Sequence, residues 1–297
     1  MTWTLGIDVS KFQNVIDWPT VVKTPPAWIV TQIASGVVSP LSFAWIRIGQ
    51  GTQLDPQFER NWHEAQAQGL RVGAYYAAIP GEDNPRDPIA DAQAAAARLF
   101  AWFSQVGGVQ GHQMGVALDW EINPNKAPVA YCQAWGAQFC AGTTAAIKNP
   151  HQATAVYSYQ SWWTTYGWSL KADQRLWAAH PVPTKPQELV PGNIPHWAWE
   201  LASQTKFWQF GQLTWPGITG NVVDVDVYTG APEVMLADFG WTAPLVPSSG
   251  PTTAPPITRT SDPVTAPAPT PADTALTHVT RAQQELSQAA ALLKTQA

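Results

Sequence analysis

The chain has 297 residues, of which 45% are hydrophobic and 12% charged, and its formal net charge is −5. This length accommodates one large domain of roughly 200–250 residues plus an appendage. No cluster of Lys and Arg stands out, which excludes the electrostatic footprint of a nucleic-acid-binding protein. No window approaches about 18 consecutive apolar residues, so we expect no membrane span, and the N-terminus lacks the pattern of a cleaved signal peptide.

Short apolar stretches alternate with helical stretches through most of the chain. The predicted strands are WTLGIDVS (3–10), FAWIRIGQG (43–51), RVGAYYAAIP (71–80), MGVALDWEI (114–122), ATAVYSY (153–159), RLWAAHP (175–181), HWAWEL (196–201), KFWQFG (206–211) and VDVDVY (223–228). Helical stretches such as 56–69 and 88–107 separate them. This order predicts an α/β fold with a TIM-like (β/α) barrel that becomes irregular in its last third, where the helices thin out.

The fourth predicted strand ends on two carboxylates, Asp119 and Glu121, with Trp120 between them. Because side chains at i and i+2 share a face of a strand, the two acids should point the same way and Trp120 towards the helices. The site of such a barrel lies at the carboxyl ends of its strands. The strand order therefore predicts that this pair lies with Asp8 and with Asp224 or Asp226.

A cluster of carboxylates at one end of a barrel has a chemical consequence. Mutual repulsion and lost solvation raise the pKa values and keep at least one proton on the cluster near neutral pH. A protonated carboxyl beside an ionised one is the arrangement that cleaves glycosidic bonds. The D-x-E pattern alone also fits strand-end caps or a divalent-cation site, although no loop has the acid density of an EF-hand.

Cysteine and histidine spacing gives no sign of a metal or a disulfide. Cys132 and Cys140 fall in one predicted helix. Eight residues place them about 12 Å apart along the axis, whereas a disulfide needs Cα atoms within about 7 Å. The six histidines show no ligand spacing. We therefore expect no metal and no cofactor.

The composition changes sharply near Pro244. Residues 244–274 are rich in Pro, Thr and Ala and predict an extended linker, whereas residues 275–297 are rich in helix formers. Apolar residues from Leu276 to Leu293 fit a short coiled-coil-like seam, which would support weak self-association, and a frayed amphipathic helix explains them equally well. We thus predict three parts: a barrel over 1–243, the linker, and a C-terminal amphipathic helix.

Several segments taken together resemble a known family. GIDVSKFQ, FAWIRIGQG, GAYYAA, LDWE, AVYSYQSWW, LWAAHP, FWQFG and VDVDVY occur in an order similar to that of glycoside hydrolase family 25, the lysozymes or N-acetylmuramidases. The likeness spans about residues 3–230. Its most specific elements are the D-x-S-x-x-Q opening, the D-x-E strand and the V-D-x-D segment that follows a W-Q strand.

The resemblance implies roles for individual residues. Glu121 matches the general acid, and Asp119 matches the carboxylate that supports attack by the substrate's 2-acetamido group. Asp8 and Asp224 match flanking acids of the catalytic set, and Asp226 stands where the family often has Asn or Asp. The residues that would bind substrate are Tyr76, Tyr157, Trp177, Gln209, Asp226 and Arg47.

The implied activity is hydrolysis of the β-1,4 bond between N-acetylmuramic acid and N-acetylglucosamine in bacterial peptidoglycan. The sequence fits a bacteriophage endolysin, held in the host cytoplasm before release to the wall, or a virion-associated lysin. The alternatives are a non-catalytic glycan-binding or virion structural module on the same barrel, and a hydrolase of chitin-like polymers. The long segment 21–42 and the loop PGEDNPRDP (80–88) depart from the family pattern, which leaves the preferred wall chemotype open.

Overall fold

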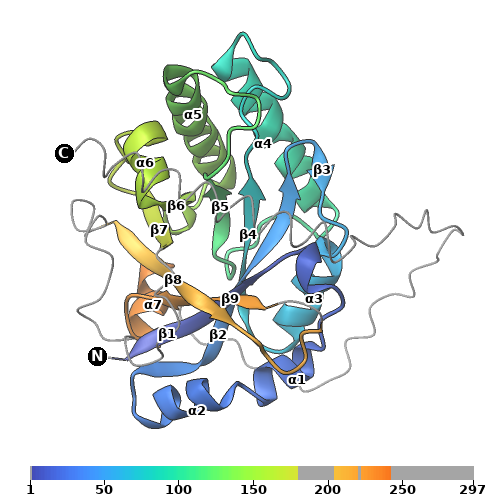
Figure 1. Ribbon diagram of the computed structural model, residues 1–297, viewed down its shortest axis with the longest axis vertical. Helices are drawn as coiled ribbons and strands as arrows, with labels where there is room; N and C mark the ends of the chain where they lie inside the picture. Colours follow the sequence, from blue (N-terminus) through green and yellow to red (C-terminus); the bar gives the residue numbers. More distant parts are fainter. Residues whose placement is uncertain (1, 180–203, 220–221, 242–297) are drawn as a thin grey trace, which may run out of the picture. The chain divides into compact units, whose positions relative to one another are not determined.

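The computed structural model describes residues 2–179, 204–219 and 222–241. The strand predicted at 196–201, and the linker and helix predicted for 244–297, lie outside the described residues. Within them, one sheet closes into a barrel in the order β1-β2-β4-β5-β6-β7-β8-β9, with β9 paired back to β1 (Figure 1). The predicted α/β barrel is therefore confirmed.

The barrel strands match the predicted positions closely. They are β1 (Trp3–Val9), β2 (Val38–Gln50), β4 (Arg71–Ala77), β5 (Gly115–Asp119), β6 (Ala155–Tyr159), β7 (Arg175–Ala179), β8 (Thr205–Leu213) and β9 (Val223–Tyr228), while β3 (Gln53–Leu54) forms a short hairpin with β2. β1 to β8 pair in parallel around the barrel, whereas β9 is antiparallel to both of its neighbours, β8 and β1. This reversal gives the predicted irregularity a structural form.

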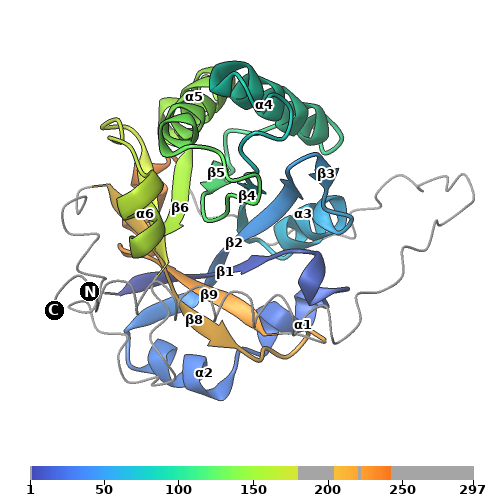
Figure 2. The same ribbon diagram turned by 45° about the horizontal axis from the view of Figure 1, so that its top comes forward.

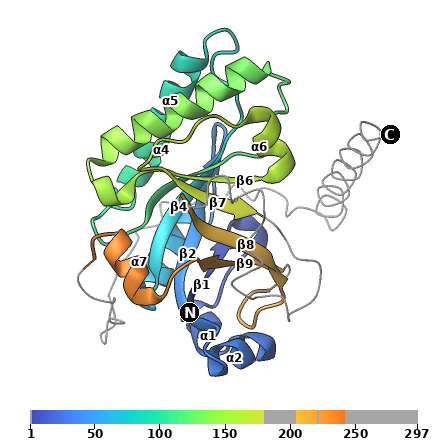
Figure 3. The same cartoon turned by 90° about the vertical axis from the view of Figure 1, so that its left-hand side faces the viewer.

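Helices surround the strands, as Figures 2 and 3 show. They are α1 (Trp18–Lys23), α2 (Ala27–Ala34), α3 (Phe58–Ala67), α4 (Pro88–Ser104), α5 (Val129–Ile147), α6 (Gln160–Tyr166) and α7 (Pro232–Asp238), with 3-10 turns η1 (Lys11–Gln13) and η2 (Pro150–Gln152). None of the helices in the described part of the chain combines the length and apolar character needed to cross a bilayer. Cys132 and Cys140 are buried in α5 and are not bonded to each other.

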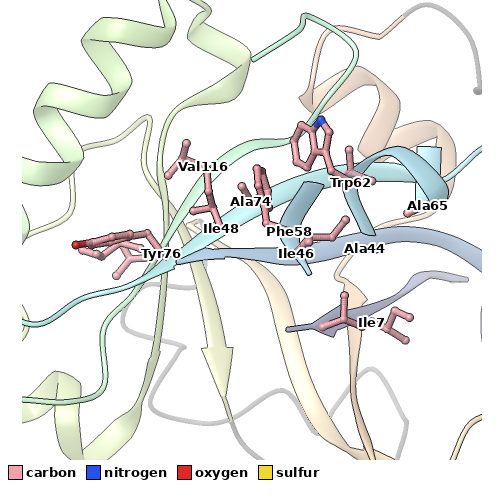
Figure 4. Packing of buried hydrophobic residues seen from close by; sticks show 14 of the residues in the cluster. Ile7, Ala44, Ile46, Ile48, Phe58, Trp62, Ala65, Ala74, Tyr76 and Val116 are labelled. Atoms are coloured by element: carbon pink, nitrogen blue, oxygen red, sulfur yellow. The ribbon is translucent and has the colours of Figure 1, made fainter. Parts of the chain in front are cut away.

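Alternation along each strand divides the core into two parts. Outward side chains such as Ile7, Ile46 and Ala74 pack with the helices in an outer layer, part of which is shown in Figure 4. Inward side chains fill the barrel interior with aromatic rings, including Trp45 and Trp177, which stack at 5.4 Å between ring centroids. Because a parallel sheet is covered on one face and filled on the other, its strands are nearly continuously apolar.

Two inward glycines make room for this aromatic filling. A Cβ atom on Gly6 would lie 2.1 Å from the Phe43 ring, and one on Gly73 would lie 2.1 Å from the Trp45 ring. Any side chain at either position would therefore displace a ring that is already buried. The glycines allow large rings to meet inside a narrow barrel.

The N-terminal ends of the strands are closed by residues that follow β9. Phe239 and Trp241 stack at 4.6 Å, and each carries an arginine over its outer face: Arg175 lies 4.2 Å from the Phe239 centroid and Arg71 lies 4.3 Å from that of Trp241. Both arginines begin a strand. This arginine–aromatic stack covers one end of the barrel interior and leaves the opposite end, the mouth, for chemistry.

Candidate active site

Three strands bring four aspartates together at the mouth of the barrel. Asp8 lies near the end of β1, Asp119 ends β5, and Asp224 and Asp226 lie near the start of the antiparallel strand β9. The β1–β9 register pairs Asp8 with Asp224 directly. The charges of Asp224, Asp226 and Asp119 all act on the Asp8 carboxyl. The cluster that the strand-end positions predicted is therefore present in the fold.

Burial and neighbouring charges shift the cluster towards its protonated form. Burial is the largest cause that raises the pKa of Asp8 well above the usual carboxyl range, and the charges of Asp224 and Asp226 add to it. Burial also raises the pKa of Asp226, again with help from Asp224. The expectation that the mouth retains a proton near neutral pH thus agrees with the electrostatics of the folded chain.

The segment that carries Asp119 and Glu121 is held from both sides. The Trp120 N–H donates to the Tyr157 carbonyl at 2.9 Å, and the Ser158 hydroxyl donates to the Trp120 carbonyl at 3.0 Å. The Trp120 ring is buried outside the barrel and stacks on Trp135. Trp120 therefore points towards the helices, as predicted. Asp119 faces the barrel, and Glu121 follows directly as a half-buried residue.

A chain of hydrogen bonds supports Asp8 from the opposite wall. The Tyr157 hydroxyl donates to Gln209 Oε1 at 2.9 Å, and Gln209 Nε2 donates to Asp8 Oδ2 at 2.7 Å. The amide bond favours the ionised form of Asp8 and partly opposes the effect of burial on its pKa. Tyr157 and Gln209 thus lie in the mouth, and both orient a carboxyl as well as lining it.

Trp177 and Asp226 lie deeper than predicted. Trp177 Nε1 donates to Asp226 Oδ1 at 2.8 Å, and the Asp226 side chain is fully buried. The Trp177 ring is enclosed by Trp45 and Tyr157. The prediction that these two residues contact substrate is therefore wrong for this conformation, because other side chains separate them from solvent.

Arg47 is the positive charge of the mouth. Its Nε donates to Asp55 Oδ2 at 2.7 Å, and its guanidinium lies 4.9 Å from the centroid of the Phe12 ring. Burial acts to lower the pKa of Arg47, but Tyr75, Asp55 and Asp119 together raise it. Arg47 is therefore a fixed cation that faces Asp119.

Asp55 is a functional-site residue that the sequence reasoning missed. Its carboxylate binds Arg47 and also accepts hydrogen bonds from the Lys11 N–H at 3.0 Å and the Gln57 N–H at 2.9 Å. It thereby joins the loops that follow β1 and β2. The available signal was an Asp-Pro turn directly after a strand.

Tyr76 does not line the mouth, which corrects the sequence-based prediction. It packs with Ile48 and Val116 in the outer layer (Figure 4), stacks on Phe139, and donates its hydroxyl hydrogen to the Gly51 carbonyl at 2.8 Å. The neighbouring residue Tyr75 points inward instead. Burial and the charge of Asp8 raise the pKa of Tyr75, and the charge of Arg47 opposes them. The two-residue period of β4 distinguishes these positions.

The extended loop at 80–88 is tied down by one buried carboxylate. Asp91 in α4 accepts hydrogen bonds from the N–H groups of Gly81 (2.6 Å), Asp83 (2.8 Å) and Asn84 (3.0 Å), and from the Tyr131 hydroxyl (2.9 Å). The loop also contacts the segment after β5, because Asn125 Nδ2 donates to the Pro80 carbonyl at 3.0 Å. The loop is a fixed part of the rim beside Glu121.

No group of three or more His, Cys, Asp or Glu side chains in the described residues is arranged to hold a metal ion. The four aspartates instead have Trp, Gln and Arg side chains around them. What the arrangement provides is proton storage, fixed negative charge and a cation that faces Asp119.

Sequence comparison assigns most of the barrel to one family. A model of the family described as Glycosyl hydrolases family 25 matches residues 7–215. An uncharacterized protein of Escherichia coli, YegX, is 38% identical over 81 residues, which cover 27% of the chain and 26% of YegX. The chain therefore spans about a quarter of the length of this curated relative.

Structural comparison gives the same grouping. The bacterial lysozyme of Streptomyces coelicolor is 25% identical, with a TM-score of 0.56 over 80% of the chain and 97% of the lysozyme. The catalytic domain of endolysin ply40, from a bacteriophage of Listeria monocytogenes, is 20% identical, with a TM-score of 0.52 over 80% of the chain and 98% of that domain. The second likeness concerns the fold.

Proposed function

Since the chain belongs to glycosyl hydrolase family 25 and is a glycoside hydrolase, we propose that it cleaves the β-1,4 bond between N-acetylmuramic acid and N-acetylglucosamine in bacterial peptidoglycan. The observation that carries this proposal is the cluster of Asp8, Asp119, Asp224 and Asp226 at the mouth. Together with Glu121 it supplies a proton and fixed negative charge, the two requirements of glycosidic cleavage.

In this proposal Glu121 is the general acid. It protonates the glycosidic oxygen as the bond to the leaving sugar breaks. Glu121 is half-buried at the end of β5, next to the fixed loop at 80–88. Its position one residue beyond a pinned strand suits a proton donor that must reach a bond above the mouth.

Asp119 supports the positive charge that develops on the muramic acid ring. Its carboxylate would also orient the substrate's 2-acetamido group for attack, as the family resemblance implies. Arg47 faces Asp119 and favours its ionised state, while the charge of Asp119 also acts on Asp8. Asp119 is thus the fixed anion of the pair, and Glu121 is the proton carrier.

The walls of the mouth would hold the glycan. Tyr157, Gln209 and Arg47 present polar groups there, and Tyr75 takes the place that was predicted for Tyr76. Aromatic rings with a polar edge suit both the flat faces and the hydroxyl groups of pyranose sugars. The similarity to the Streptomyces coelicolor lysozyme supports a lysozyme substrate.

The origin of the chain in a bacteriophage, and its storage in the host cytoplasm before release, stay predictions from the sequence. The same holds for weak self-association through residues 275–297. Activity of the intact protein on whole walls is likewise a proposal, because the chain spans only part of its curated relative.

Product analysis tests the proposed bond specificity. Purified peptidoglycan is digested with the full chain, the new reducing ends are reduced with borohydride, and the fragments are identified by mass spectrometry. The proposal predicts reduced N-acetylmuramic acid at the new ends. Reduced N-acetylglucosamine would instead identify a glucosaminidase, and wall binding without new ends would favour a glycan-binding module.

A parallel digestion of chitin oligomers separates the remaining alternative. A muramidase should leave them intact or cleave them far more slowly than peptidoglycan, because they lack the lactyl group. Equal rates on both polymers would contradict the assignment to muramic acid.

A further inference from the structure

Asp226 has a buried oxygen that lacks a donor. Its Oδ1 accepts the hydrogen bond from Trp177 Nε1, whereas Oδ2 is inaccessible to solvent and has no hydrogen-bond donor among the described residues. Such an oxygen normally costs about 1–3 kcal/mol or more, especially on a charged group. The site must therefore supply something that satisfies it.

The Asp8 carboxyl lies within hydrogen-bonding reach of Asp226. Asp8 is also buried, with only 6% of its surface exposed, and Gln209 Nε2 occupies its Oδ2. Each carboxyl thus has one oxygen held by a neutral N–H donor. Two ionised carboxylates at this separation would repel each other and lack solvation, whereas one O–H between them removes both penalties.

We propose that Asp8 and Asp226 share a single proton and act as one negatively charged unit, which Trp177 and Gln209 hold in place. Asp226 is then a positioning residue that acts through Asp8. The role of this unit in hydrolysis rests on the proposed function, whereas the shared proton itself does not.

The groups around the unit are accounted for on each packed element. Asp224 on β9 and Asp119 on β5 act on Asp8 with negative charge. Tyr75 on β4 faces Asp8 with a phenol, and Arg47 on β2 faces Tyr75 and Asp119. Trp177 on β7 and Gln209 on β8 contribute neutral donors. A second negative charge within the unit would add to Asp224 and Asp119, which favours retention of the proton.

Carboxyl NMR tests the shared proton directly. The 13Cγ shifts of aspartate are followed against pH in the full chain and in Asp226→Asn, Asp8→Asn and Asp173→Asn, the last an exposed control. An Asn at position 226 can accept from Trp177 and donate its amide to Asp8, so it replaces the proton with a permanent donor. A pair of this kind titrates in two steps that belong to both groups.

The expected result is one aspartate step well above the ordinary value of about 3.9 in the full chain and in Asp173→Asn. This step should be absent from Asp226→Asn and from Asp8→Asn, so that either variant decides the question if the other does not fold. Survival of the step in both, or ordinary titration of every aspartate in the full chain, would overturn the proposal.

Kinetics test the positioning role separately. As the pH rises and the unit loses its proton, repulsion should displace Asp8, so the ratio of kcat/KM for Asp226→Asn over the unmodified chain should increase several-fold. The ratio for Asp173→Asn should stay constant. A constant ratio for Asp226→Asn would refute the positioning role, while failure of the proposed hydrolysis would leave the NMR result standing.

Discussion

Side-chain charges divide the mouth into two halves. Arg47, held by Asp55 and Phe12, faces Asp119, whereas Asp8 and Asp226 lie where no cation is printed as a cause of their titration. The first half favours an ionised carboxylate and the second favours a retained proton. Different environments thus give similar acids different tasks.

The buried acids should make stability depend on pH in a defined direction. A raised pKa in the folded state means that the native chain keeps a proton which the unfolded chain has lost. This contribution is complete below about pH 4 and is lost as the pH rises through the raised value. The free energy of unfolding of the full chain minus that of Asp226→Asn should therefore decrease across this window in urea titrations. A difference that increases with pH would contradict the burial of a protonated pair.

Tyr76→Phe should affect stability and leave catalysis alone. Tyr76 donates to the Gly51 carbonyl and accepts from Arg98, both outside the mouth. Loss of these bonds should reduce the free energy of unfolding by about 0.5–1.5 kcal/mol. Urea unfolding and kcat/KM on soluble peptidoglycan fragments check this. A large rise in KM would restore Tyr76 as a substrate-lining residue.

At the residue scale, the sequence predicted which acids gather but not how deep each lies. Asp8, Asp119, Glu121 and Asp224 follow from strand ends and period-two alternation. The burial of Asp226 depends on how far the antiparallel strand β9 passes along β1 and on the indole of Trp177 above it. Neither the sliding of strands past one another nor the bond to an indole can be read from local patterns.

At the scale of elements, the rim is organised by hydrogen bonds from helices to loops. Asp91 begins the first turns of α4 and gathers three N–H groups of the loop at 80–88. Arg98, two turns further along α4, binds Asp83 in the same loop. The extended loop therefore has the rigidity of a helix surface, which fits a wall of the substrate groove.

Asp91→Ala should release this loop. Removal of a carboxylate that accepts three N–H bonds and one hydroxyl should cost about 2–3 kcal/mol in the free energy of unfolding. Hydrogen exchange should accelerate at the amides of Gly81, Asp83 and Asn84. Asp87→Ala is the matched control, since it removes only the N-cap of α4 and should cost about 1 kcal/mol. Unchanged exchange at the three amides would refute the role of Asp91.

The strong periodic elements could be predicted, and the weak ones could not. The strands around Asp8, Tyr75 and Asp119 and the long helices α3, α4 and α5 combine apolar patterning with sufficient length. The short helices α1 and α2 and the early start of β2 at Val38 depend on packing against neighbours. In such segments tertiary contacts outweigh local propensity.

At the scale of the whole catalytic part, the fold extends beyond the family match. That match ends at residue 215, yet Asp224 and Asp226 lie on the following strand, and Phe239 and Trp241 close the barrel's base. Residues 216–241 thus contribute to both ends of the barrel. The predicted boundary at 243 falls just after the last of them.

Truncation tests this boundary. A chain that ends at 243 should keep its melting temperature within a few degrees, together with its activity on soluble fragments, because the arginine–aromatic stack is complete. A chain that ends at 230 lacks α7, Phe239 and Trp241, so Arg71 and Arg175 lose their stacked partners and cooperative unfolding should disappear. Circular dichroism melting curves check both. Equal melting of the two would show that the base needs no closure.

The most direct test of the central claim compares the full chain with Glu121→Gln, and with Glu59→Gln as an exposed control on α3. All three are folded to the same extent by circular dichroism, incubated with purified peptidoglycan, and assayed for borohydride-reduced ends by mass spectrometry. The account predicts reduced N-acetylmuramic acid from the full chain and from Glu59→Gln, and at least about a 10²-fold lower rate from Glu121→Gln, because it lacks the proton donor. Undiminished release by Glu121→Gln would contradict the claim.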